Sequence, residues 1–150
     1  MTQMLSTEVL RRLPYFAGVH EESLRKVAMI SEERSFSAGD ILFREGEPAT
    51  HLFLIVSGEV DIQLVMGDGE HRTADTLVAG DLIVWSSLVE PFRTRFHGVA
   101  RKDTSVIAIE AKSLRALLET DMTLGYRMMS GVANALSHRL AGARVQLASR

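Results

Sequence analysis

A segment in the middle of the chain concentrates side chains that are suited to holding a small anion. Serine hydroxyls and arginine guanidinium groups donate hydrogen bonds to phosphate or carboxylate oxygens, and an indole can lie flat against a ring. We therefore predict a ligand-binding site in this segment. Its candidate residues are Gly80, Trp85, Ser86, Ser87, Arg93 and Arg95.

The same side chains also have a purely structural interpretation. Trp85 can fill the interior of the domain, and Ser86 and Ser87 can cap a short helical turn. Arg93 and Arg95 can be solvated or ion-paired, as surface arginines usually are. The sequence leaves two interpretations open: a pocket that binds an anion, or an interior that is already filled.

Catalytic and metal-binding chemistry has less support in the sequence. The chain has no cysteine, which excludes disulfides, thiolate nucleophiles and cysteine-ligated metal centres. Its five histidines are isolated from one another: His20, His51, His71, His97 and His138. Because no HExxH motif or comparable ligand spacing is present, we expect neither an enzyme nor a metal site. Haem ligation by His51, His71 or His97 is a further alternative.

Short apolar stretches separated by glycines must position the candidate site. The turn glycines are Gly39, Gly46, Gly58, Gly67, Gly69 and Gly80. Closely spaced strands with regular turn signals predict a mainly β domain, an antiparallel β-barrel or jelly roll of about eight strands. The expected strands cover residues 32–36, 41–44, 51–57, 59–65, 71–77, 81–83, 95–100 and 105–109.

Helices are predicted on both sides of these strands. We expect one domain, with a helical lead-in over 1–30 that Thr7 can cap, the barrel over 31–110 and C-terminal helices over 111–150. A long helix is expected over 124–147. Its apolar residues recur every three or four positions, which predicts a homodimer with paired helices. They are Met129, Val132, Leu136, Leu140 and Leu147.

The order of the turns resembles the cyclic-nucleotide-binding domain of Crp/Fnr-type regulators and kinase regulatory subunits. The likeness rests on three stretches: Phe36-Ser-Ala-Gly-Asp-Ile-Leu-Phe-Arg-Glu-Gly-Glu-Pro, His51-Leu-Phe-Leu-Ile-Val-Ser-Gly-Glu-Val and Leu77-Val-Ala-Gly-Asp-Leu-Ile. The resemblance implies the same barrel, a ligand held between the barrel and residues 80–100, and a C-terminal helix that forms dimers.

The phosphate-binding cassette, which the resemblance places at residues 80–100, departs from the family's chemistry. In the family a Gly-Glu pair holds the ribose hydroxyl and a later arginine pairs with the phosphate. Here the pair falls on Val84 and Trp85, and the arginine falls on Thr94. The segment resembles uncharacterised stand-alone bacterial members that carry Trp-Ser followed by Pro-aromatic-Arg. We therefore expect weak or absent cyclic AMP binding.

Composition sets the expectations about location and partners. A chain of 150 residues with a net charge of −2 suits one domain and gives no sign of nucleic-acid binding. It has no signal peptide and no apolar run of about 18 residues, so we predict a cytoplasmic protein with no membrane association. Crp/Fnr-type activators continue into a helix-turn-helix module, whereas this sequence ends at Arg150, so we expect no DNA-binding domain and no direct DNA contact.

These observations together predict a non-enzymatic sensor that passes its signal to a protein partner. No cofactor is certain, and the expected ligand is a small anionic metabolite or a cyclic nucleotide bound atypically. The alternative is a ligand-free module for dimerisation and protein interaction, in which Trp85 fills the pocket.

Overall fold

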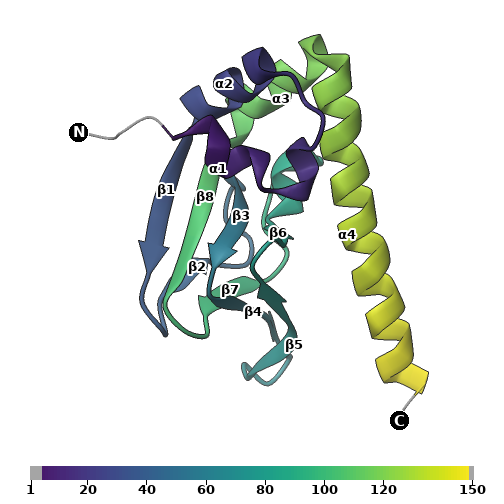
Figure 1. Ribbon diagram of the computed structural model, residues 1–150. Coiled ribbons are helices and arrows are strands. Elements are labelled where there is room, and N and C mark those ends of the chain that lie inside the picture. Colours follow the sequence, from purple (N-terminus) through teal and green to yellow (C-terminus); the bar gives the residue numbers. More distant parts are fainter. Residues whose placement is uncertain (1–4, 149–150) are drawn as a thin grey trace.

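A computed structural model describes residues 5–148 as two four-stranded antiparallel sheets with flanking helices (Figure 1). The sheets have the strand orders β1-β8-β3-β6 and β2-β7-β4-β5. The strands are β1 (Ser31–Phe36), β2 (Ile41–Phe43), β3 (His51–Ser57), β4 (Glu59–Val65), β5 (His71–Val78), β6 (Leu82–Ile83), β7 (His97–Ala100) and β8 (Thr104–Glu110). The predicted eight-stranded jelly roll with flanking helices is confirmed, but closure into a barrel is wrong. No described strand of one sheet pairs with a strand of the other sheet, so the edge strands β1, β6, β2 and β5 leave the roll open.

Side-chain alternation along the central strands builds two apolar cores. Along β4, Val60 faces the interior between the sheets, and along β3, Phe53 and Ile55 do the same. Leu52 and Leu54 of β3 point to the opposite face and join a second core beneath the helices. A strand that is apolar on both faces must be covered on both, so the sheet that contains β3 forms the middle layer of the domain, between the helices and the second sheet.

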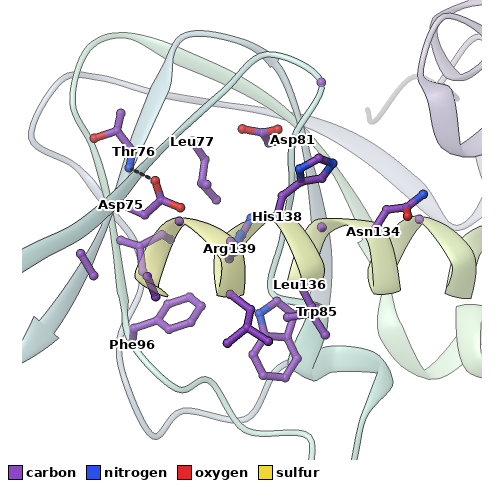
Figure 2. A pocket seen from close by; sticks show the side chains of 18 of the residues that line it. Asp75, Thr76, Leu77, Asp81, Trp85, Phe96, Asn134, Leu136, His138 and Arg139 are labelled. Atoms are coloured by element: carbon purple, nitrogen blue, oxygen red, sulfur yellow. Dashed lines mark hydrogen bonds between the residues drawn. The ribbon is translucent and has the colours of Figure 1, made fainter. Parts of the chain in front are cut away.

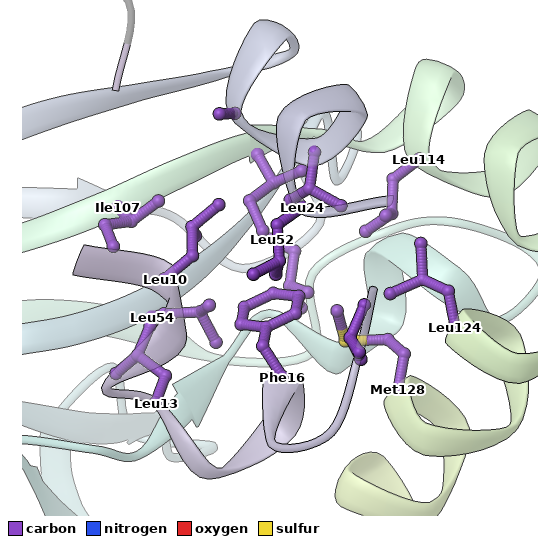
Figure 3. Packing of buried hydrophobic residues seen from close by; sticks show 14 of the residues in the cluster. Leu10, Leu13, Phe16, Leu24, Leu52, Leu54, Ile107, Leu114, Leu124 and Met128 are labelled. Atoms are coloured by element: carbon purple, nitrogen blue, oxygen red, sulfur yellow. The ribbon is translucent and has the colours of Figure 1, made fainter. Parts of the chain in front are cut away.

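Short helices cover the outer face of the β1-β8-β3-β6 sheet. They are α1 (Thr7–Arg11), the 3-10 turn η1 (Pro14–Phe16), α2 (Glu21–Met29) and α3 (Ala111–Thr120). Phe16 is fully buried at the centre of their contact, beside Leu10 and Leu24 (Figure 3). The expectation that Thr7 caps α1 is wrong: the Ser6 hydroxyl accepts from the backbone N–H of Glu8 at 3.2 Å, and Thr7 is already helical.

The long helix α4 (Met122–Ala148) runs beside β5 and β6 (Figure 1). Two of its glycines have a packing reason. A Cβ on Gly125 would lie 2.8 Å from the Leu118 carbonyl oxygen, and one on Gly131 would collide with the Tyr15 ring. These close contacts offset the roughly 1 kcal/mol that glycine costs inside a helix. Neither α4 nor any other helix within residues 5–148 is long and apolar enough to cross a lipid bilayer.

The apolar stripe predicted along α4 divides between two surfaces. Val132 is 3% exposed and packs into the core of its own domain, and Leu136 is half-buried against that core. Met129, Leu140 and Leu147 are 41%, 64% and 66% exposed. Three of the five residues therefore form an exposed strip that a second copy could cover, and self-association stays a prediction.

The start of α4 depends on the carboxylate of Asp121. This carboxylate accepts hydrogen bonds from the Ser23 hydroxyl and, at 3.1 Å, from the backbone N–H of Leu124. The bonds from Ser23 and Leu124 lower the pKa of Asp121 in the folded protein. We expect Asp121→Ala to lower the free energy of unfolding by about 1 kcal/mol at neutral pH, the usual contribution of such a cap.

The pH dependence of this loss follows from the lowered pKa. The stabilisation is present in full above the unfolded pKa of about 3.9 and is lost as the pH falls through the lower folded pKa. Urea unfolding followed by circular dichroism at about pH 7 and about pH 3 would measure it. Glu119→Ala, an exposed neighbour, is the control. Equal losses in the two variants, or a loss for Asp121→Ala that does not shrink with acid, would contradict the assignment.

Candidate ligand-binding site

A cavity of about 1190 Å³ lies between α4 and the two-sheet roll. Its walls come from η1, β4, β5, the β5–β6 turn, the 3-10 turn η2 (Trp85–Leu88) and α4. Figure 2 shows how the lining residues lie. Trp85, Phe96 and Leu136 lie on one side of the α4 ribbon, and Asp81 and His138 lie on the other. Leu77 lies near Asp75 and Thr76, so apolar and polar side chains both line the cavity (Figure 2).

Gly80 and Trp85 are the two predicted site residues that line this cavity. Gly80 has a φ of 92°, a left-handed conformation that glycine adopts without strain, in the turn from β5 to β6. Trp85 is half-buried and packs against the core beneath the helices, yet the cavity stays open beside it. The indole thus forms part of the wall, and its contact with a ligand remains a prediction.

The backbone enters η2 through an unusual conformation at Val84. Its φ of 64° and ψ of 44° lie in the left-handed region, which a β-branched residue rarely adopts. Val84 occupies the position where the resemblance to cyclic-nucleotide domains places a glycine. The local chain path is therefore one that glycine would adopt freely, although the side chain here is a buried valine.

Ser86 and Ser87 lie behind the cavity wall. Both are buried, and neither lines the cavity. The Ser87 carbonyl accepts a hydrogen bond of 2.7 Å from Arg115, whose guanidinium carbon lies 4.0 Å from the centre of the Phe92 ring. The Ser87 hydroxyl is buried without a hydrogen-bond partner among the described residues. These contacts fix the cassette to α3, and the two serines remain predictions as ligand donors.

Arg93 and Arg95 are exposed and do not line the cavity. Arg93 donates a hydrogen bond of 2.8 Å to the carbonyl of Gly46, in the turn that follows β2. The structure therefore does not bring the two arginines together with Trp85 around the cavity, and anion binding by either of them is untested.

Thr94 has a structural role where the family resemblance places an arginine. It is buried, and its hydroxyl donates to the Arg44 carbonyl and accepts from the Glu47 backbone N–H at 3.1 Å. Backbone bonds between Thr94 and residues 46–47 reinforce the same contact. The side chain at this position therefore stabilises a turn and does not line the cavity.

Arg139 of α4 is a cavity residue that the sequence did not reveal. Its guanidinium donates a hydrogen bond of 2.9 Å to the carbonyl of Leu82 and is half-buried. Burial lowers the pKa of Arg139, whereas Asp75 and Asp81 raise it. Arginine remains charged despite such shifts, so a fixed positive charge lines the cavity.

Tyr15 of η1 is the second residue that was missed. Its ring packs on Gly131, and its hydroxyl donates a hydrogen bond of 3.0 Å to the Gly80 carbonyl. Burial, aided by the charge of Asp81, raises the pKa of Tyr15 and keeps the hydroxyl protonated as a donor.

Helical spacing held a signal for Arg139. Starting from Leu124, the next positions on the inner face of α4 are Met128 and Val132, each four residues on, and Arg139 follows after a further seven. A helix repeats its face at intervals of three, four and seven residues, so Arg139 continues the buried face.

The histidines considered for haem lie away from the cavity. His51 contacts Arg34, with 3.2 Å between the two nitrogens. His71 and His97 stack on the β2-β7-β4-β5 sheet with ring centres 4.9 Å apart. The Nδ1 atom of His97 accepts a hydrogen bond of 3.1 Å from the Glu45 backbone N–H. Within residues 5–148 no group of three or more potential metal ligands was found.

The sequence of this chain matches a family model, and its structure is similar to known crystal structures. The model of the cyclic nucleotide-binding domain matches residues 33–121. The crystal structure of a candidate cyclic nucleotide-binding protein from Geobacter metallireducens superposes with a TM-score of 0.81 at 34% identity. That alignment covers 91% of this chain and 99% of the other.

Two bacterial regulators are similar over part of their length. The CRP-like cAMP-activated global transcriptional regulator of Mycobacterium tuberculosis is 22% identical over 129 residues, which cover 86% of this chain and 58% of that protein. The cyclic AMP receptor protein of Thermus thermophilus is 25% identical over 134 residues, or 89% and 60% of the two. The chain thus spans about three fifths of these relatives. Since the family model covers more than half of its sequence, this chain belongs to the cyclic nucleotide-binding domain family.

Proposed function

We propose that this chain is a non-enzymatic sensor domain that binds a small molecule in the cavity between α4 and the roll. The observation that carries the proposal is the origin of the lining residues: many lie on α4, and the others lie on the roll, on its β5–β6 and η2 turns and on η1. A molecule in contact with both changes the free energy of each position that α4 can take. Occupancy of the cavity is thereby converted into a movement of the helix.

The ligand in this proposal is a small anionic metabolite or a cyclic nucleotide that is bound atypically. Membership of the family supports a ligand at this place in the fold. The cassette supports an atypical mode, because Trp85 replaces the acidic ribose acceptor and Thr94 is occupied with the 44–47 turn. Nothing in this mode requires a resident cofactor.

The output of the sensor in this proposal passes through α4. The exposed strip of Met129, Leu140 and Leu147 supports pairing with a second copy and relay to a protein partner. We place this activity in the cytoplasm, without direct DNA contact and without a membrane.

The exposed strip also favours a second candidate function. In this alternative the chain is a module for dimerisation and protein interaction whose cavity binds nothing. Trp85, which packs against the core beneath the helices, would then have a purely structural role.

Binding of a neutral fluorophore separates the two functions. N-phenyl-1-naphthylamine absorbs where tryptophan emits, so its entry into the cavity should quench Trp85, the one tryptophan of the chain. We expect saturable binding at one site per chain. Ala74→Phe narrows the cavity and should weaken binding about tenfold or more, a loss of roughly 1.4 kcal/mol.

Thr73→Phe is the matched control, because Thr73 is adjacent to Ala74 in β5 but does not line the cavity. Native affinity is expected for this variant. Failure of the dye to saturate, or the same affinity in both variants, would contradict the sensor and support the interaction module.

Cyclic AMP is expected to bind more weakly than micromolar. The ribose hydroxyl lacks its acidic partner at Trp85, a loss of about 1–3 kcal/mol, and Thr94 offers no charge to the phosphate. Isothermal titration calorimetry measures this directly, with the Thermus thermophilus cyclic AMP receptor protein as a positive control. A dissociation constant at or below the micromolar range would refute the expectation.

Dimerisation is tested on the exposed strip of α4. Met129→Glu should give a folded monomer, because Met129 belongs to the exposed strip and, unlike Leu140 and Leu147, does not line the cavity. Sedimentation velocity reports the mass. Ser137→Glu, exposed on another side of α4, should leave the dimer intact. A native chain that stays monomeric at high concentration would disprove the pairing.

A further inference from the structure

Arg139 is a cation without a counter-ion inside the cavity. It makes one hydrogen bond, to the Leu82 carbonyl, and the described residues give it no ion pair within 4.0 Å. A guanidinium carries five N–H donors, so four remain for water or a ligand. An arginine that is half-buried in a cavity normally has a charged partner, because removing a cation from water costs free energy.

Two carboxylates act on Arg139 through their charge but form no ion pair with it among the described residues. Asp75 and Asp81 line the same cavity, but each accepts a backbone hydrogen bond close to itself: Asp75 from the Thr76 N–H within β5 at 2.8 Å, and Asp81 from the Val78 N–H in the β5–β6 turn at 2.8 Å. The two negative charges weaken the attraction that Arg139 exerts on an anion. Removing a doubly charged group from water into such a cavity also costs more free energy than removing a singly charged one, which favours a ligand with one negative charge.

The apolar part of the lining defines the rest of the ligand. Trp85, Phe96 and Leu136 line the same cavity as Arg139. Flat apolar groups bury favourably against indole and phenyl rings. A ligand that contacts both kinds of lining residue therefore has a flat apolar body and one negative charge.

We propose that Arg139 is the anion-binding residue of this site and that its ligand class is a singly charged, flat amphipathic acid such as an aromatic carboxylate. The inference rests on the proposed function, since it needs the cavity to bind a ligand. Under this proposal the positive charge that binds the anion belongs to Arg139 of α4 and not to Arg93 or Arg95 of the cassette. The charge of the bound ligand then acts directly on the helix, in competition with the Leu82 carbonyl.

Three probes with one body test the charge of the ligand by calorimetry at about pH 8. They are 2-naphthalenemethanol, which is neutral, 2-naphthoate, which has one negative charge, and 2-naphthyl phosphate, which has two. On the native chain, 2-naphthoate should bind at least about tenfold more tightly than the alcohol, the contribution of one charge-assisted hydrogen bond. The phosphate should bind more weakly than 2-naphthoate.

Variants test whether Arg139 is the side chain that makes 2-naphthoate bind more tightly than the alcohol. Arg139→Gln should abolish the preference for 2-naphthoate, Arg139→Lys should retain part of it, and Arg95→Gln, outside the cavity lining, should retain all of it. Thermal melts establish that each variant is folded, and the probe comparison on the native chain does not depend on them. Equal affinity for the acid and the alcohol, or a preference that survives Arg139→Gln, overturns the inference but leaves the proposed function standing. Absence of binding by all three probes overturns both.

Discussion

The position of α4 depends on the contact between the Tyr15 ring and Gly131. Any side chain at residue 131 would collide with the ring, so glycine alone lets η1 and α4 approach this closely. The Tyr15 hydroxyl simultaneously holds the Gly80 carbonyl at 3.0 Å. One side chain thereby joins the lead-in, the β5–β6 turn and the long helix. The width of the cavity and the reach of Arg139 to Leu82 both follow from this junction.

The cassette shows that a backbone path and a binding chemistry can be separated. Val84 keeps a left-handed conformation without a glycine, at a cost of order 1–3 kcal/mol that the surrounding packing must offset. Thr94 holds a turn where an arginine would face a phosphate, and Ser87 is fixed by Arg115 through its carbonyl. The backbone path of the family's cassette is therefore present, whereas the side chains that would contact a nucleotide have been replaced. The fold does not by itself define the ligand.

Sequence patterns predicted the elements that depend on near neighbours. The bounds of β3 and β4 agree with the expectation to the residue, because alternation and flanking glycines are local signals. Barrel closure could not be predicted, since it depends on whether distant sheet edges meet. The strip on α4 was predicted as one face, yet Val132 is buried in its own domain, whereas Leu140 is largely exposed and lines the cavity. Arg139 escaped notice for a related reason: its environment is created by Leu82 and Tyr15, which are remote in sequence.

The spacing of the two attachments along α4 makes the helix a lever. Gly131 rests on Tyr15, and Arg139, eight residues further on, is tied to Leu82. At 1.5 Å per residue these points lie about 12 Å apart, and the end of the helix at Ala148 lies about 25 Å from the pivot at Gly131. A rigid helix that turns about Gly131 doubles at its tip any sideways displacement imposed at Arg139. A shift of about 1 Å in the cavity would thus become a shift of about 2 Å at the far end, with Leu140 and Leu147 carried along.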